Sequence, residues 1–254
     1  MCTLALYFRI FKDYPLIVAA NRDEHYDRAS APPSRWSTKP AIVAGKDLVA
    51  GGTWLGVNEH GLLAAVLNRR IRNGQKPPPN PRSRGLLCLD VLKLKTAAEA
   101  WGVLHDFEDR YQPFTLVFAD TTQACFAYNT HREIKMGGLK QGLHGFSNTG
   151  EFEVQSEKVS RAYGQLASLA DEIRSKASDA SSWLQPFSKV LGDHAAGNDS
   201  NDPREAICVH GNESGTVSSS IIVYSRSNQQ CQTFYCPGPP CRESFGEPVA
   251  LRLR

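Results

Sequence analysis

A thiol and a run of charged side chains lie close to the start of this 254-residue chain. Cys2 follows the first methionine, and Asn21-Arg22-Asp23-Glu24 follows the next apolar segment. Methionine aminopeptidase removes a leading methionine when the second residue is small, which leaves Cys2 with a thiol and a free α-amine. Their ordinary pKa values are about 8.5 and about 7.7–8.0, so the amine can accept the thiol's proton near neutral pH. The pattern predicts a cysteine nucleophile that carries its own general base, although Cys2 could also be only a small residue that starts a strand.

The charged run can serve this chemistry. Alternation along a strand places Asn21 and Asp23 on one face and Arg22 and Glu24 on the other. Asp23 can hold the ammonium or orient a substrate amide. Arg22 can pair with Asp23, bind a substrate carboxylate or favour a thiolate at Cys2, and we expect Asn21 and Glu24 to contact substrate. The alternative interpretation is a group of surface ion pairs, which contribute little energy.

Two further asparagines are candidates for an oxyanion hole. Asn68 ends a predicted strand, and Asn148 lies in Gly145-Phe146-Ser147-Asn148. A side-chain amide near the nucleophile can donate to a developing oxyanion, and removing such a donor costs about 10²–10³ in rate. Asparagine in a turn is the more common use of this residue.

The elements that must position these residues begin with a hairpin. Residues 4–11 and 15–20 are rich in β-forming residues, and Lys12-Asp13-Tyr14 between them is typical of a turn. Similar numbers of residues lead out and back, at about 3.3 Å each. Cys2 and the charged run should therefore lie side by side at one end of a sheet.

The rest of the chain alternates between predicted strands and helices. Strands are predicted at 53–57, 62–67, 114–118, 124–128, 217–224, 232–235 and 249–253. Helices are predicted at 84–104, 155–178 and 181–192, and loops around Pro32-Pro33 and Pro40, at 71–82 and at 192–204. This order favours an α+β fold of antiparallel sheets flanked by helices. We expect a single domain over residues 1–254.

The charge and the motifs of the sequence limit the kinds of partner that this chain is expected to bind. The net charge is +3, and the densest basic cluster includes Arg69 and Arg70; it is typical of a solvated loop or of an anion-binding loop. Nucleic-acid-binding motifs, a signal peptide and apolar runs of about 18 residues are absent from the sequence. We expect a cytoplasmic protein without a membrane span or nucleic-acid partner, which binds a small molecule; the sequence does not specify its oligomeric state.

The seven cysteines favour reduced thiols, because an odd count without a secretory signal argues against a disulfide framework. Cys231, Cys236 and Cys241 are five residues apart, and His210 could complete a zinc site. Zinc sites usually use closer cysteine pairs. We therefore predict neither a metal ligand nor a cofactor.

Several motifs resemble the NRDE family, which comprises the transport and Golgi organisation protein 2 homologues. They appear in the family's order and span nearly the whole chain: Met1-Cys2-Thr3, residues 20–28 (ANRDEHYDR), Ala31-Pro32, residues 44–48 (AGKDL), residues 51–57 (GGTWLGV), Ser83-Arg84-Gly85, Gly145-Phe146-Ser147-Asn148 and residues 215–219 (GTVSS).

This resemblance implies an Ntn-hydrolase-like αββα four-layer sandwich, in which the first residue after processing is the nucleophile. The branch of cholylglycine hydrolase and penicillin V acylase, which also begins with cysteine, is the nearest chemical analogue. By position, Cys2 would be nucleophile and base. Asp23 and Asn68 would match residues that follow strands in that branch, and Asn148 would match the oxyanion-hole asparagine.

The sequence differs from the pattern of these relatives at two positions. The analogue branch has an arginine where this chain has Ala20, with Arg22 adjacent to Asp23 instead. Family members often have arginine at the position of Val217, so anion binding would shift to Arg69 or Arg70.

The expected function is hydrolysis of a linear amide bond in a small acylated substrate. The alternative is a carrier for haem or acyl-CoA, in line with a link of the family to haem trafficking, with Cys2, His25 or His144 as candidate axial ligands.

Overall fold

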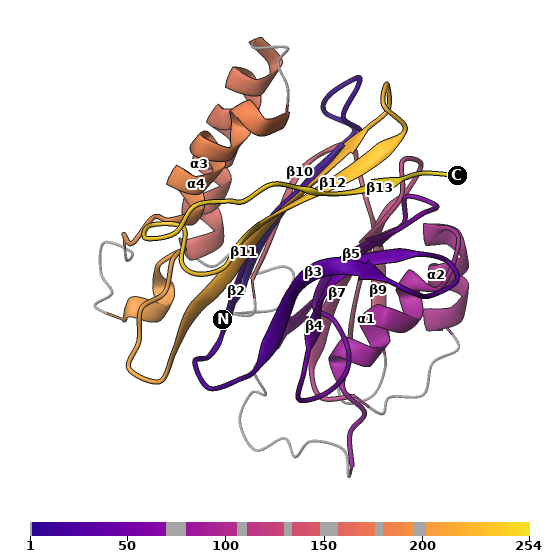
Figure 1. Ribbon diagram of the computed structural model, residues 1–254, viewed down its shortest axis with the longest axis horizontal. Coiled ribbons are helices and arrows are strands. Elements are labelled where there is room, and N and C mark those ends of the chain that lie inside the picture. Colours follow the sequence, from indigo (N-terminus) through magenta and orange to yellow (C-terminus); the bar gives the residue numbers. More distant parts are fainter. Residues whose placement is uncertain are drawn as a thin grey trace. The chain divides into compact units, whose positions relative to one another are not determined.

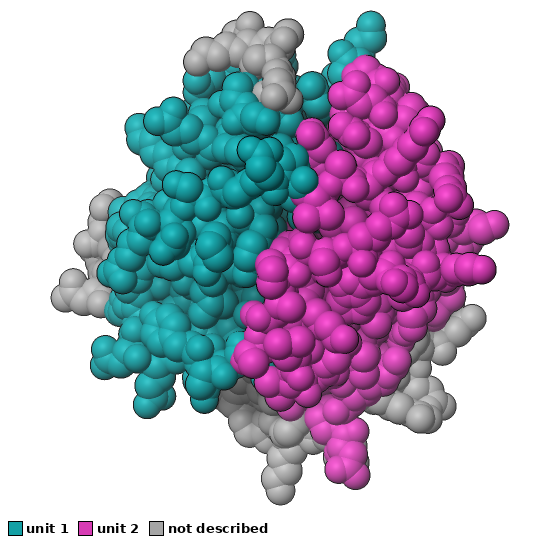
Figure 2. Space-filling model, viewed as in Figure 1, with its two compact units in different colours: residues 1–28, 142–223, 233–248 teal, residues 29–141, 224–232, 249–254 magenta. Residues whose placement is uncertain are grey.

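The computed structural model describes residues 2–69, 80–105, 111–129, 134–147, 157–175, 180–195 and 202–254. The chain divides into two compact units, coloured separately in Figure 2. The first unit comprises residues 1–28, 142–223 and 233–248, and the second comprises residues 29–141, 224–232 and 249–254. Each unit is thus assembled from segments far apart in the sequence. The expectation of one domain over residues 1–254 stays a prediction.

The first unit contains most of a six-stranded sheet with the order β10-β1-β2-β11-β12-β13. The strands are β1 (Thr3–Phe8), β2 (Leu16–His25), β10 (Gly142–Ser147), β11 (Ser214–Ser225), β12 (Gln230–Cys236) and β13 (Val249–Arg252). The residues of β13 and the adjoining ends of β11 and β12 belong to the second unit. β1 pairs antiparallel with both β2 and β10, so the amino-terminal strand is internal to the sheet.

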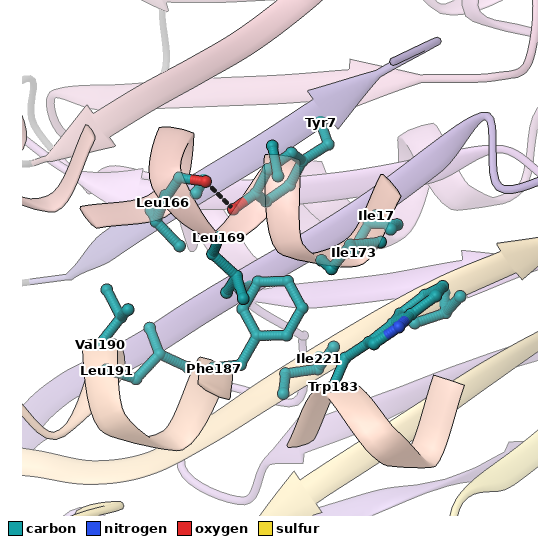
Figure 3. Close-up of a cluster of buried hydrophobic side chains, with 14 of the residues drawn as sticks. Tyr7, Ile17, Leu166, Leu169, Ile173, Trp183, Phe187, Val190, Leu191 and Ile221 are labelled. Atoms are coloured by element: carbon teal, nitrogen blue, oxygen red, sulfur yellow. Dashed lines mark hydrogen bonds between the residues drawn. The ribbon is translucent and has the colours of Figure 1, made fainter. Parts of the chain in front are cut away.

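Helices cover one face of this sheet. They are α3 (Glu157–Ser175) and α4 (Leu184–Leu191), the latter preceded by a 3₁₀ turn, Ala180–Trp183, and a further 3₁₀ turn spans Pro203–Glu205. Figure 1 shows α3 and α4 side by side along the strands. Their apolar residues pack on Tyr7 and Ile17 of the hairpin, and the Tyr7 hydroxyl donates to the Leu166 carbonyl over 2.8 Å (Figure 3). The buried phenol therefore keeps a hydrogen-bond partner, as a buried tyrosine requires.

The second unit contains a seven-stranded antiparallel sheet with the order β3-β4-β5-β6-β7-β8-β9. Its strands are β3 (Ser30–Trp36), β4 (Ile42–Asp47), β5 (Leu55–Asn58), β6 (Leu63–Asn68), β7 (Phe114–Ala119), β8 (Ala124–Asn129) and β9 (Ile134–Leu139). Helices α1 (Arg84–Leu92) and α2 (Ala97–His105) pack on it and share its apolar core.

Two of the glycine-containing motifs meet in this unit. A Cβ on Gly52 would collide with the backbone of Gly85. The Thr53 N–H donates to the Gly85 carbonyl over 3.0 Å, and the Ser83 hydroxyl caps α1 by accepting the Gly85 N–H over 3.2 Å. Glycine at position 52 is therefore required for the close approach of these two segments.

The structure corrects the single helix predicted over residues 84–104, which is two helices. Asn58 ends the first helix, because its side-chain amide donates to the carbonyls of Leu92 and Leu94 over 2.9 and 2.6 Å. The Thr96 hydroxyl then accepts a backbone N–H at the start of the second helix. Helical periodicity continues across the break, so the break itself is set by a side chain from another strand.

The loop predicted around Pro32-Pro33 and Pro40 is confirmed at Pro40, which lies between β3 and β4, and is wrong at Pro32-Pro33, because these residues lie within β3. This strand is at the edge of its sheet and has an irregular register between Ala31 and Ser34, which is where proline is tolerated. The sequence patterns also predict no strand at β4, β9 or β10. The sequences of β9 and β10 are glycine-rich and lack the β-forming residues that mark a strand.

The other predicted elements are confirmed, with shifts of their ends that reach five residues at the end of β2. Residues 155–156 and 176–178 of one predicted helix, and parts of the predicted loops at 71–82 and 192–204, lie outside the described residues. The predicted α+β class, with antiparallel sheets flanked by helices, is confirmed. No helix in the described ranges is long and apolar enough to span a membrane.

Candidate active site

The β1–β2 hairpin brings Cys2 to the charged run, as predicted. Thr3 pairs with Asn21 in the antiparallel register, so Cys2 directly precedes the paired residues. The Cys2 Sγ lies 3.8 Å from the backbone carbonyl oxygen of Asp23. Strand β2 extends beyond Ala20 to His25, so the charged run lies within the sheet and not after its end.

The two faces of the hairpin have different surroundings. The core beneath α3 and α4 takes alternate residues of both strands: Ala5, Tyr7, Ile17 and Ala19. Asn21 and Asp23 continue this helix-facing row, and Arg22 continues the opposite row. The same alternation along β1 assigns Cys2 to the face of Arg22. The carboxylate of Asp23 and the side chain of Cys2 therefore belong to opposite faces, joined through the Asp23 backbone.

Asp23 forms a buried ion pair. Its Oδ2 lies 3.4 Å from the Lys158 Nζ of α3, and both side chains are about 1% exposed. Its Oδ1 accepts a hydrogen bond from the Thr216 hydroxyl over 2.6 Å. A buried charge is tolerated when it is paired and hydrogen-bonded, which is the case for this carboxylate.

Asn21 is also buried and has structural partners. Its Nδ2 donates to the carbonyls of Leu191 and Ile207 over 2.8 and 2.9 Å, and its Oδ1 accepts from the Ser219 hydroxyl over 2.6 Å. These contacts use both amide protons. The geometry gives Asn21 a role in fixing β2 against the segments that cover it.

A bulge in β11 allows the Thr216 hydroxyl to reach Asp23 and the Ser219 hydroxyl to reach Asn21. Thr216 pairs with Asp23 and Ser218 pairs with Arg22, so Val217 is the additional residue between them. The bulge lets Thr216 and Ser219, three residues apart, face the same side of the sheet. Gly215 before the bulge is required, because a Cβ there would lie 2.6 Å from the Val209 carbonyl oxygen. The motif GTVSS is thus the sequence of this bulge.

Arg22 and Glu24 occupy the opposite face. Arg22 is 6% exposed. Burial raises the pKa of the Tyr235 hydroxyl, while a hydrogen bond with Ser218 and the charge of Arg22 act to lower it, so Arg22 lies near this phenol. Glu24 is partly buried, and its Oε2 lies 3.7 Å from the Nε of Arg28.

The thiol of Cys2 is partly buried. Burial raises its pKa above the ordinary thiol value; the positive amino terminus acts in the opposite sense, and the Asp23 and Glu24 charges add to the increase. A thiol in this environment is protonated at neutral pH and needs a base before it can attack.

The remaining predicted site residues belong to the second unit or lie outside the described residues. Asn148 and Arg70 lie outside the described residues, and Asn148 would directly follow β10. Asn68 and Arg69 belong to the second unit, where Asn68 ends β6. The Arg69 guanidinium donates to the Asn129 carbonyl over 2.9 Å and lies 4.5 Å from the centre of the Tyr128 ring.

Sequence reasoning missed Lys158 and the role of Thr216. Thr216 lies in one of the motifs, and its glycine neighbour is a signal of close backbone approach. Lys158 has no comparable signal, because a lysine near the start of an amphipathic helix is usually solvated. Its partner lies 135 residues earlier in the chain.

The fold is shared with solved structures. The structure is similar to penicillin V acylase from Agrobacterium tumefaciens, with a TM-score of 0.58 at 15% identity, covering 91% of this chain and 82% of that one. It is also similar to a variant of conjugated bile acid hydrolase from Clostridium perfringens, with a TM-score of 0.58 at 12% identity, covering 97% and 92%. The chain therefore has the Ntn-hydrolase fold.

The family follows from sequence. The Transport and Golgi organisation 2 family matches residues 1–234, and the chain belongs to this family. The mouse Transport and Golgi organization 2 homolog is 33% identical over 150 residues, which are 53% of this chain and 51% of the relative. The chain spans about half the length of the curated relatives it matches.

Proposed function

We propose that this protein is an N-terminal-cysteine hydrolase that cleaves a linear C–N amide bond in a small acylated substrate. The observation that carries the proposal is the position of Cys2, whose sulfur lies against the end of β2 in a fold shared with amide-cleaving enzymes. Removal of Met1 would place a free α-amine on the same residue as the thiol.

The chemistry proceeds through a thioester. The α-amine takes the proton of the Cys2 thiol, and the thiolate attacks the amide carbonyl carbon to form a C–S bond. The tetrahedral intermediate then collapses, the C–N bond breaks, and the α-ammonium protonates the leaving amine. Water next attacks the thioester, with the amine as base, and releases the carboxylic acid and the thiol.

The neighbouring residues have supporting roles in this proposal. Asp23, held by Lys158 and Thr216, fixes the end of β2 beside Cys2 and provides negative charge that favours the α-ammonium. Arg22, on the face of Cys2, provides a cation for an acidic group of the substrate or for the thiolate. Asn148 is the candidate donor to the oxyanion, by its position in the family motif.

The carrier alternative has weaker support from the geometry. His144 pairs with Leu6, which pairs in turn with Val18, whereas the exposed His25 ends β2 seven residues later. At about 3.3 Å per residue, the backbone positions of His144 and His25 are about 23 Å apart along the strands. The two histidines cannot serve as the two axial ligands of one haem. A haem titration that produced a shifted Soret band, lost on replacing Cys2, would favour the carrier.

The test compares the native chain with a variant that has one glycine inserted between Met1 and Cys2. The variant keeps the thiol but moves the free amine to another residue. Intact-mass analysis should show that the native chain begins at Cys2, and a panel of fluorogenic N-acyl amides should be cleaved by the native chain alone. Retention of Met1 in the purified protein, or equal turnover by the inserted variant, would contradict the amine's role as base.

A further inference from the structure

Four side chains with metal-binding atoms gather in the first unit, apart from Cys2. They are His194, Cys208, His210 and Cys241, and their ligand atoms all lie within 4.8 Å of one another. They come from three segments without regular secondary structure: the start of the segment after α4, the segment before β11 and the segment after β12. We refer to them as the His/Cys cluster.

Three distances among Cys208, His210 and Cys241 are close to those of tetrahedral coordination, and the ligand atom of His194 lies within 4.8 Å of the other three. The Sγ atoms of Cys208 and Cys241 are 3.8 Å apart, and the His210 Nε2 lies 3.6 Å from the first and 3.3 Å from the second. Zinc bonds of about 2.3 Å to sulfur and 2.0–2.1 Å to nitrogen, at tetrahedral angles, imply about 3.8 Å between sulfurs and about 3.6 Å between sulfur and nitrogen. The sulfur separation is too long for a disulfide, which needs about 2.05 Å.

The donor set also selects the metal. Two thiolates and two imidazoles in tetrahedral array favour zinc over hard cations such as magnesium or calcium, which prefer oxygen. Four protein ligands close the coordination sphere and leave no position for a reacting water, which is the pattern of a structural site. The rings of His194 and His210 are 4.8 Å apart between centroids, close enough for both to reach one ion.

Neighbouring hydrogen bonds hold the segments in place for such an ion. The Cys208 N–H donates to the Asp193 carbonyl over 2.8 Å, which joins the segment of Cys208 to that of His194. Gly192 packs against Cys241, because a Cβ on this glycine would lie 3.2 Å from the Cys241 nitrogen. Outer contacts of this kind orient ligands and are a regular part of protein metal sites.

We propose that the His/Cys cluster binds one zinc ion that fixes the segment lining the helix-facing side of β2. Val209, between two of the ligands, donates its N–H to the Thr216 hydroxyl over 2.9 Å and accepts the Thr216 N–H over 2.8 Å. The same hydroxyl donates to the Asp23 carboxylate. The ion thus stabilises the support of Asp23. This proposal does not depend on the proposed hydrolase activity.

The sequence alone suggests a different set of ligands, in which Cys231, Cys236 and Cys241 would be joined by His210, and their spacing predicts no metal site. Cys231 and Cys236 lie within β12 and are buried, and the Cys236 thiol donates to the Gly238 carbonyl over 3.3 Å. The structure groups Cys241 and His210 with two other residues. The spacing of the four ligands matches no zinc-finger pattern, and only the Cys208-Val209-His210 triplet is a local signal.

The test measures metal content and cobalt spectra of the full-length protein. We expect inductively coupled plasma mass spectrometry to find one zinc ion per chain. Replacement of the zinc by cobalt should give the intense visible absorption bands of tetrahedral thiolate coordination. Cys241→Ser and His210→Ala should each lose the stoichiometric zinc, whereas His60→Ala and Cys125→Ala in the second unit should keep it. Cys2→Ala should also keep zinc, which separates this proposal from the hydrolase.

Three outcomes would overturn the proposal. One is wild-type protein that contains no zinc as isolated and gives no tetrahedral cobalt spectrum after reconstitution; this needs no variant and is independent of variant folding. Another is stoichiometric zinc retained by both Cys241→Ser and His210→Ala. The third is a mass two hydrogens below that of the free thiols, with a disulfide mapped to Cys208 and Cys241 in protein kept under reducing conditions.

Discussion

Asp120 in the second unit and Asp23 in the first are both buried carboxylates, but they have different partners. Asp120 accepts the backbone N–H groups of Ala97, Thr122 and Gln123 and the Thr122 hydroxyl, over 2.6–2.9 Å. It thereby starts helix α2 and closes the turn after β7. Asp23 instead pairs with a lysine from a distant helix and a threonine from a neighbouring strand.

Two buried asparagines, one in each unit, also differ in their hydrogen-bond partners. Asn58 in the second unit caps the end of a helix, whereas Asn21 in the first connects β2 to two covering segments and to β11. Asn58 and Asp120 in the second unit thus bond mainly to backbone groups at helix ends and turns. Asp23 and Asn21 in the first unit also join side chains of other elements beside Cys2, which is the kind of arrangement expected around a reactive group.

The largest expected effect is on the rate of amide hydrolysis, which should depend on a cysteine of the first unit and not on one of the second. Cys2→Ala should lower amide hydrolysis by about 10⁶-fold, because removal of an activated nucleophile leaves only binding and oxyanion stabilisation. Cys125→Ala, in the core of the second unit, should keep the wild-type rate. Steady-state kinetics on N-acyl amides measures both, and comparable rates for the two variants would remove the distinction.

The buried ion pair gives the largest expected effect on stability. Lys158→Met should cost about 3–5 kcal/mol in the free energy of unfolding, because it leaves the Asp23 charge buried without its cation. The double variant Lys158→Met/Asp23→Leu should recover most of that loss and remain inactive. Urea denaturation and hydrolysis assays on the same samples measure this. A double variant with wild-type activity would show that the pair has no role beside Cys2.

A smaller effect is expected at Asp120. Burial acts to raise the pKa of this carboxyl, but the hydrogen bonds from Thr122, Ala97 and Gln123 are stronger in sum and lower it. A lowered folded-state pKa contributes stability that is complete above the unfolded value of about 3.9 and is lost as pH falls through the folded value. Asp120→Ala should therefore cost about 1–3 kcal/mol at neutral pH and less at pH 3, without changing hydrolysis.

Denaturation midpoints of this variant at neutral and acid pH provide the measurement. Asp120→Asn is the matched control, because it keeps one acceptor oxygen and should lose less stability. An equal cost of Asp120→Ala at both pH values would contradict the assigned hydrogen bonds.

The smallest effect concerns the rate of Cys2 alkylation. Burial raises the pKa of this thiol, so its thiolate forms only as pH rises beyond the ordinary value of about 8.5. In protein with an uncleaved amino terminus, iodoacetamide labelling of Cys2 should have a midpoint above that value. Peptide mapping separates Cys2 from the exposed Cys241, and a midpoint below the ordinary value would show that nearby cations outweigh burial.

The sequence allowed the hairpin, the position of Cys2 beside the charged run and the fold class to be predicted, because these depend on local periodicity and on motifs. It did not allow the contact of Lys158 with Asp23 or the His/Cys cluster to be predicted. Both join residues from separate segments of the chain, and the Cys208-Val209-His210 triplet is the one local signal among them, which is too weak to identify a site by itself. The break between α1 and α2 was missed for the same reason, since Asn58 ends the helix from another strand.

The central claim is that Cys2, as the first residue, forms a covalent acyl intermediate. The direct measurement is the intact mass of the protein, quenched in acid shortly after mixing with an N-acyl amide. The account predicts the mass of residues 2–254 plus one acyl group, located on Cys2 by peptide mapping. A chain that retains Met1 and carries no acyl group on Cys2 while the amide is being consumed would contradict it.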